Sequence, residues 1–255
     1  MTVNLLRLLV VAVLLVLWQF AAPAFNLVFF MSTPSEIGKA FWAILLDGTL
    51  LANAWTTAIE TVAGFALGGI VGAATGVVLG RNKLLADVLE PFITMFYSLP
   101  KAALAPLFIL WLGIGINMKI VLVSTIVFFL VFLNTFTGVR QVSREQLAIT
   151  KLMGASEGQL VTKVIMPSAM IWVFTGLRLS VPNALIGAIL GEIVASNRGL
   201  GYLLMRSTSQ FDTPGAFAAL FAILLMSLFF NIVVRISERL LMPWRTEDTG
   251  AELRV

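Results

Sequence analysis

Long runs of apolar residues dominate this chain and limit its possible folds more than any other feature. The hydrocarbon core of a bilayer, about 30 Å thick, is crossed by about 20 mostly apolar residues in a helix. Six such runs occur, over residues 5–30, 50–80, 92–111, 120–139, 164–195 and 215–241. Charged residues make up only 12% of the 255 residues, about half the share in an ordinary soluble chain. The sequence therefore predicts an all-α polytopic membrane protein with six transmembrane helices.

The basic residues between the runs predict how the chain is oriented. With the N-terminus in the cytoplasm, eleven Lys and Arg residues lie inside, and only Lys39, Lys119, Arg198 and Arg206 lie outside. We therefore expect both termini to be cytoplasmic. The first run continues through residues 27–31, so we expect it to be a retained helix and not a cleaved signal peptide. The net charge of +4 then reflects membrane topology, and no nucleic-acid partner is expected.

The residue types that the chain lacks exclude several kinds of chemistry. There is no Cys and no His, which removes disulfides, thiolate nucleophiles, Ser-His catalysis and His-based metal sites. No Gly-x-x-x-x-Gly-Lys-Ser/Thr phosphate loop occurs, so the chain has no recognisable means of hydrolysing ATP. We expect no catalytic residue, no cofactor and no metal site.

Glycine recurs at every fourth position of the second run, at Gly64, Gly68, Gly72, Gly76 and Gly80. These positions form a slowly winding ridge without side chains along one helix. Small residues at this spacing let another helix approach closely in lipid. The pattern favours helix packing inside one subunit over a dimer face or a pathway face.

Prolines and charges interrupt the apolar runs at a few points. The third run contains breaks at Pro91, Pro100 and Pro106. Irregular backbone at membrane depth occurs where it is buried in protein or lines a wet cavity. Candidate substrate-pathway residues are Lys101 beside a break, together with Arg178 and Glu192, which return to one helix face. The alternative is that Arg178 is a buried ion-pair partner and that Lys101 reaches the interface.

Residues 140–163, on the predicted cytoplasmic side, contain helix-start and helix-end signals that the other loops lack. Ser-x-x-Gln capping patterns begin at Ser143 and at Ser156. Gly154 between them suits the left-handed position that ends a helix. One arc of the first short helix is apolar and consists of Ile149, Leu152 and Met153. The pattern predicts helix, glycine corner, helix, which is either an ordinary amphipathic surface loop or a docking knob for a cytoplasmic partner.

These residues resemble a known family. From Gly154, nine residues lead to Val164-Ile165-Met166-Pro167, which is similar to the second half of the EAA loop of ABC importer permeases. Further matches follow the family's order: Gly64-Phe65, Pro100, Ala105-Pro106-Leu107, Leu112-Gly113-Ile114-Gly115, Asn134-Thr135, Gly138-Val139-Arg140, Gly176-Leu177-Arg178, Glu192, Gly199-Leu200-Gly201-Tyr202 and Trp244. Together they resemble the nitrate/sulfonate/taurine branch of the binding-protein-dependent transport family.

The resemblance implies a type I ABC importer permease fold in a bacterial inner membrane, with residues 140–163 as the coupling segment. It implies an N-terminal helix and external loop over 1–48, a permease core over 49–245 and a cytoplasmic tail over 246–255. Implied partners are cytoplasmic ATPase subunits, a second permease subunit (the same or a homologous chain) and an extracytoplasmic substrate-binding protein. The residues implied in ATPase docking are Ala148, Ile149, Thr150, Leu152, Met153, Gly154, Ala155 and Pro167.

The sequence departs from the family pattern at three places. Ala148-Ile149-Thr150 stands where the family usually has Glu-Ala-Ala, Glu60 where it tends to have a basic residue, and Asn231 where it often has Asp. The branch implies a small anion such as a sulfonate, taurine or nitrate, although some members carry vitamin precursors or aromatic compounds.

Three other classes stay open from the residues alone. An ion-gradient-driven secondary transporter fits the broken helices but predicts inverted halves, which the sequence does not show. A membrane scaffold explains the glycines but not the charges at depth. A membrane enzyme would have to act through carboxylates.

Overall fold

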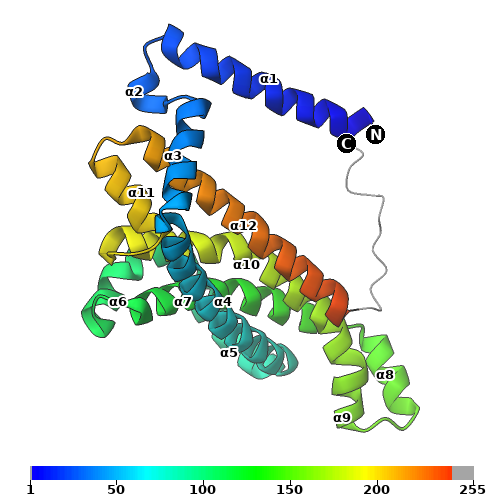
Figure 1. Cartoon of the computed structure of the whole chain (residues 1–255). Helices are drawn as coiled ribbons and strands as arrows, with labels where there is room; N and C mark the ends of the chain where they lie inside the picture. The colour runs from blue at the N-terminus through cyan, green and yellow to red at the C-terminus, as the bar shows by residue number, and fades with distance from the viewer. Residues whose placement is uncertain (1, 243–255) are drawn as a thin grey trace.

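The computed structural model describes residues 2–242, and every regular element in this stretch is helical (Figure 1). The long helices are α1 (Thr2–Ala24), α4 (Thr49–Arg81), α7 (Ile116–Arg140), α10 (Met166–Ala195) and α12 (Thr213–Leu241). The shorter ones are α2 (Val28–Met31), α3 (Pro34–Leu46), α5 (Lys83–Ser98), η1 (Lys101–Leu104), α6 (Ala105–Leu112), α8 (Arg144–Leu152), α9 (Glu157–Leu160), η2 (Val161–Ile165) and α11 (Leu200–Ser209). The all-α prediction is confirmed. The predicted tail 246–255, Trp244, and two of the basic residues that we counted as inside, Arg245 and Arg254, lie outside the described residues.

Helix α7 is the centre of the bundle, with α4 against one side and α10 against another. Its valines at 123, 127 and 131 are fully buried. The glycine ridge of α4 faces α7: a Cβ atom at Gly72 would lie 2.7 Å from the Phe128 carbonyl oxygen, and one at Gly76 would lie 2.7 Å from the Thr135 Cβ. Their lack of side chains therefore allows backbone contact between the two helices.

Successive contacts between α4 and α7 move toward the C-terminal end of both helices. Gly64 faces Val123 and Gly80 faces Val139, so each contact joins residues 59 positions apart and the two helices are parallel. Since the end of α4 and the start of α7 then lie at opposite ends of the pair, the chain between them must cross the bundle again. The segment that does so is α5 with η1 and α6, which bends by 82° after Ser98. It supplies the sixth crossing beside five continuous helices. The predicted break at Pro100 is confirmed, whereas Pro91 lies inside α5, which continues past it, and Pro106 lies in the first turn of α6.

Several predicted boundaries differ from the observed ones; the helix of the third run, for example, begins at Lys83 and not at residue 92. The first apolar run ends as a helix at Ala24, because the chain turns at Asn26, whose φ of 54° is left-handed, before the separate helix α2. Helix α1 then stands away from the bundle for most of its length (Figure 1). Helix α7 begins at Ile116, four residues earlier than predicted. Lys119, which we expected in an external loop, is therefore a buried residue of α7.

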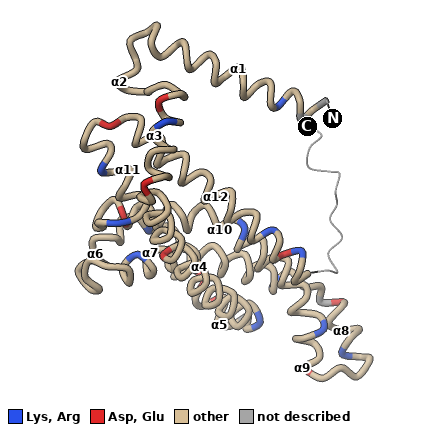
Figure 2. Tube along the Cα trace, viewed as in Figure 1, with Lys and Arg blue, Asp and Glu red and all other residues tan. Residues whose placement is uncertain are grey.

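Helices α3, α11 and α12 pack together with the start of α4. Their shared core consists of Leu50, Leu200, Leu203, Ala219 and Ala222. Figure 2 shows few charges along the long helices and several basic residues on the last turns of α12 and on α8. The bundle thus has a polar end near α11 and a basic end near α8.

Candidate functional site

The coupling segment ends its first helix at a glycine corner. Gly154 has a φ of +83°, and a Cβ atom there would meet nothing within 4 Å. The Ala155 N–H donates to the Thr150 carbonyl at 3.2 Å, and the Gly154 N–H donates to the Lys151 carbonyl at 3.0 Å. These two bonds are the Schellman arrangement that closes a helix on a left-handed residue. The predicted left-handed position of Gly154 is confirmed.

Side chains fix the starts of both short helices of the segment. Ser156 Oγ accepts the Gln159 N–H at 3.3 Å, and Gln159 Oε1 accepts the Ser156 N–H at 2.8 Å, which makes a complete capping box. At the start of α8 only the serine bond is found: Ser143 Oγ accepts the Gln146 N–H at 3.3 Å. The corner is therefore built locally, without help from the bundle.

The tip of the coupling segment is apolar and open. Leu152 is 88% exposed and Met153 is 82% exposed, and Ile149 lies on the same side of α8 with 58% exposure. Leu152 and Met153 are the two most exposed of the large apolar residues in residues 2–242, which makes them candidates for a contact with a partner. We call Leu152, Met153 and Gly154 the coupling tip.

One continuous helix connects the coupling segment to the interior of the bundle. From Glu157 to Ala195 it runs for 39 residues through α9, η2 and α10. At about 1.5 Å per residue it is far longer than the bilayer core, so one end must project into water. The π-helical turn η2 lies directly before Pro167, whose ring would collide with a carbonyl in a regular α-helix, so the widened turn accommodates it.

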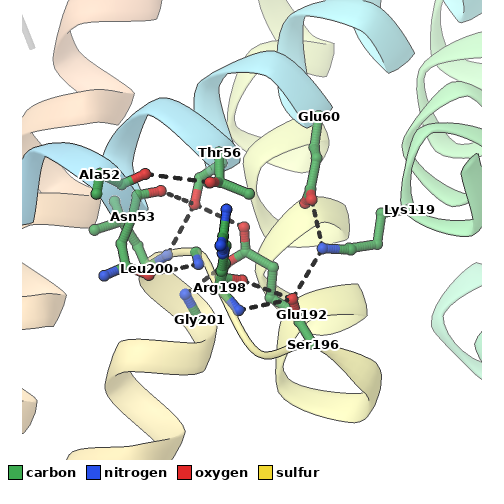
Figure 3. A network of polar contacts seen from close by, with 12 residues as sticks. Ala52, Asn53, Thr56, Glu60, Lys119, Glu192, Ser196, Arg198, Leu200 and Gly201 are labelled. Atoms are coloured by element: carbon green, nitrogen blue, oxygen red, sulfur yellow. Dashed lines mark hydrogen bonds and ion pairs between the residues drawn. The ribbon is translucent and has the colours of Figure 1, made fainter. Parts of the chain in front are cut away.

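At the other end of this helix, buried charges meet in a polar cluster, which consists of Asn53, Thr57, Glu60, Lys119 and Glu192 (Figure 3). The Lys119 ammonium pairs with the Glu60 carboxylate and donates to Ser196 Oγ at 3.0 Å. All three charged residues are at most 4% exposed. Because an unpaired charge is costly at this depth, the Glu60–Lys119 pair stabilises the contact of α4 with α7.

Glu192 and two residues of α4 together cap helix α11. Glu192 Oε2 accepts the Gly201 N–H at 2.6 Å, and Glu192 Oε1 accepts from the Thr57 hydroxyl at 2.7 Å. Thr57 Oγ1 in turn accepts the Leu200 N–H at 2.8 Å, and Asn53 Oδ1 accepts the Gly199 N–H at 2.7 Å. The first four N–H groups of a helix have no partner inside it, and here tertiary contacts supply partners for three of them, those of Gly199, Leu200 and Gly201. The carboxylate also suits the positive end of the helix dipole.

Two glycines make room for this carboxylate. Gly199 has a φ of +112°, and a Cβ atom there would overlap the Glu192 carboxylate. A Cβ atom at Gly201 would lie 2.6 Å from the Ile189 carbonyl oxygen and 2.9 Å from Glu192 Oε2. Gly199 and Gly201, which carried part of the family resemblance, therefore have a structural role at the turn from α10 to α11.

The three predicted pathway residues have separate surroundings. Lys101 in η1 donates to the Tyr97 carbonyl, and its ammonium lies 4.4 Å from the Tyr97 ring centre and 5.1 Å from that of Phe129. Arg178 pairs with Glu238 of α12, with the Arg side chain half exposed and the Glu buried. Glu192 lies in the polar cluster, so the shared helix face of Arg178 and Glu192 does not bring them to one site.

Three members of the polar cluster were not predicted from the sequence, namely Asn53, Thr57 and Lys119. Asn53, Thr57 and Glu60 recur at intervals of four and three residues on one face of α4, a signal that could have been read. Nothing local indicated Lys119 as their partner, nor that residues 200–209 form a helix. Helix α3 does carry a start signal, since Thr33 precedes Pro34 and accepts the Glu36 N–H.

Comparison with known proteins places this geometry in a family. A family model described as "Binding-protein-dependent transport system inner membrane component" matches residues 64–246. The formylaminopyrimidine transport permease protein ThiX of Halalkalibacterium halodurans is 30% identical over 236 residues, covering 92% of this chain and 94% of that protein. The putative aliphatic sulfonates transport permease protein SsuC of Bacillus subtilis is 31% identical, covering 86% of this chain and 80% of that protein. A crystal form of the MetNI methionine ABC transporter in an inward-facing conformation has the same fold, with a TM-score of 0.63 at 17% identity over 79% of this chain and 98% of that chain.

Proposed function

The chain belongs to the family of inner membrane components of binding-protein-dependent transport systems, and on that premise we propose that it couples ATP hydrolysis by a separate subunit to solute import through its coupling tip. ABC importer permeases are its relatives in sequence and in fold. This membership decides against the ion-gradient-driven transporter and the scaffold. The observation that carries the proposal is the exposed apolar tip on a preformed glycine corner.

The tip has the chemistry of a docking element. Leu152 and Met153 offer apolar area that the rest of residues 2–242 does not cover. The Schellman bonds and the capping box hold the corner before any partner arrives, so little conformational entropy is lost on docking. Of the other implied docking residues, Ala148, Ile149 and Thr150 lie on α8 before the tip, and Ala155 follows the tip directly. Pro167 lies farther along, in the first turn of α10. We propose that the tip inserts into a groove of the ATPase on the cytoplasmic side.

Movement of the tip has a direct path into the bundle. Because α9, η2 and α10 form one helix, a displacement at the coupling segment tilts the end that carries Glu192. Glu192 is bonded to α4 and to α11, so these helices follow. Closure of the ATPases on ATP would thereby switch the pathway between inward and outward access, working with a second permease subunit and an extracytoplasmic binding protein.

For the solute, we propose a small organic or inorganic anion such as a sulfonate, taurine or nitrate. The relative named for aliphatic sulfonates supports this class, and Lys101 at the break of the sixth crossing offers a cation for it. The relative named for formylaminopyrimidine supports a second class, small nitrogen heterocycles, which the rings of Tyr97 and Phe129 beside Lys101 suit. Uptake of a labelled sulfonate, challenged with unlabelled members of each class, separates the two.

Replacing Gly154 by Val tests the coupling assignment. A side chain in the left-handed conformation costs about 1–2 kcal/mol, a factor of about 5–30 in the population of the correct corner. We expect transport and binding-protein-stimulated ATP hydrolysis to fall by that factor in the reconstituted complex. Gly158→Val is the matched control, because Gly158 lies in the same segment, has an ordinary helical φ and would place its Cβ atom in an ordinary contact, 3.9 Å from Ser156 Oγ. Equal activity of the two variants would show that the coupling assignment is wrong.

A further inference from the structure

A basic pocket with an apolar floor lies where the coupling segment meets the bundle. It has a volume of about 470 Å³ and lies between the last turns of α4 and α7 and the helices α8 and α9. Val139, Leu160 and Ile165 form its floor, and Arg81, Arg140 and Lys151 stand around it. Glu157 is the one acidic residue of its lining, so the lining carries a net charge of +2.

The cations of this pocket are weakly held by the protein itself. Arg140 lies 3.6 Å from Asp87, and Lys151 lies 3.1 Å from Glu157 across the glycine corner. Both pairs are largely exposed, and such pairs contribute little because water screens them. Within residues 2–242, Arg81 makes no ion pair. The pocket therefore has cationic groups available for a ligand.

Its position matches the boundary between membrane and water. Arg81 is the last residue of α4, and Arg140 is the last residue of α7. Both helices are long and apolar enough to span a bilayer, so their ends lie at the level of the lipid headgroups. Basic residues also compensate the negative end of a helix dipole, which explains why each of these helices ends in one. It does not explain why three of them converge on one pocket with an apolar floor.

We propose that this pocket binds an anionic phospholipid, with the phosphate between Arg81, Arg140 and Lys151 and an acyl chain against the apolar floor. Basic pockets between transmembrane helices at the cytoplasmic surface have the chemistry that recognises such headgroups. A bound lipid would connect the ends of α4 and α7 with α8 and thereby hold the coupling segment against the bundle. This regulatory consequence rests on the proposed coupling function, whereas the binding itself rests only on the pocket.

Native mass spectrometry of the full-length chain in detergent, titrated with phosphatidylglycerol or phosphatidylcholine, tests the binding. We expect preferential retention of phosphatidylglycerol. The pocket variant, Arg81→Gln/Lys151→Gln, should weaken it by roughly 25-fold, at about fivefold for each basic residue lost near the surface. The charge-matched control is the double variant Lys163→Gln/Arg235→Gln, since both are exposed basic residues that do not line the pocket. A thermal unfolding curve of the pocket variant that matches the wild type shows that the fold is intact.

Three results would overturn the proposal. Equal weakening by the pocket variant and by the control variant would mean general attraction of lipid to a basic surface, and no weakening by the pocket variant would mean that these cations do not hold the lipid. Displacement of phosphatidylglycerol by soluble glycerol phosphate at equal concentration would make the ligand a free phosphate and not a lipid. Since lipid retention is measured without an ATPase, its failure leaves the Gly154→Val test of the proposed function untouched.

Discussion

The two ends of the 39-residue helix from Glu157 to Ala195 are built on opposite principles. At one end the polar cluster buries three charged side chains and binds α4, α7, α10 and α11 together. Just before the other end, the coupling tip leaves Leu152 and Met153 exposed, and a Cβ atom at Gly154 would meet nothing within 4 Å. The same helix is thus anchored inside the molecule at one end and free to meet a partner at the other.

Under the proposed function, the two ends separate the residues that stabilise the fold from the residues that contact the ATPase. Buried polar groups in a membrane are costly unless they are paired, so removing one member of a pair in the polar cluster leaves its partner unsatisfied and should be costly. The coupling tip needs none of the bundle, because its geometry comes from backbone bonds within a few residues. Substitutions in the polar cluster should therefore change stability, whereas those in the coupling tip should change coupling alone.

The largest effect is expected from Lys119→Met. It leaves the Glu60 carboxylate buried without its cation, which costs about 3–5 kcal/mol of unfolding free energy. Thermal denaturation of the detergent-solubilised protein measures this. The double variant Lys119→Met/Glu60→Leu removes both charges and should recover most of the loss. A double variant no more stable than the single one would show that the ion pair is not the reason for the loss.

A smaller loss is expected from Gly199→Ala. Its new methyl group overlaps the Glu192 carboxylate at a left-handed position, with strain of about 1–2 kcal/mol and the displacement of a charged hydrogen bond worth about 1.5–3 kcal/mol. The unfolding midpoint should fall, and the amide of Gly201 should exchange its proton faster. Gly158→Ala, at an ordinary helical φ, is the control and should show neither change.

Gly72→Ala tests the close contact of α4 with α7. The added Cβ atom lies 2.7 Å from the Phe128 carbonyl oxygen, and overpacking of this kind costs about 1–3 kcal/mol. Gly38→Ala in α3 is the matched control, because nothing lies within 4 Å of its new methyl group and alanine favours the helix. If the two variants unfold at the same temperature, α4 and α7 are less closely packed than described.

The smallest effect on stability is expected from Leu152→Asn. Its side chain is 88% exposed, so the free energy of unfolding should stay within about 0.5 kcal/mol of the wild type. Co-purification with the ATPase subunit should nevertheless weaken, because the tip loses apolar area. A variant that is destabilised yet still co-purifies would reverse the contrast between the two ends.

Local patterns were enough to predict much of this molecule. Apolar run length located the spans, proline at 100 predicted the break in the third run, and glycine with two serine caps predicted the corner at Gly154. Each of these features depends on a few neighbouring residues and on the known thickness of a bilayer, so each can be predicted from the sequence. The predicted pathway residues were less successful, since Arg178 and Glu192 share a helix face yet contact different helices.

The sequence by itself determined that this chain crosses a membrane as helices, which family it resembles and where it turns, because hydrophobic length and backbone conformation are local properties. Only the tertiary structure decided that Lys119 is the partner of Glu60, that Glu192 caps α11, and that Arg81, Arg140 and Lys151 share a pocket. These pairings join residues far apart in the chain. The Glu60–Lys119 pair and the nearness of Arg81 to Arg140 follow from the parallel packing of α4 on α7, whereas Glu192 reaches α11 from the end of α10. Such packing between distant segments is not a local property of the chain.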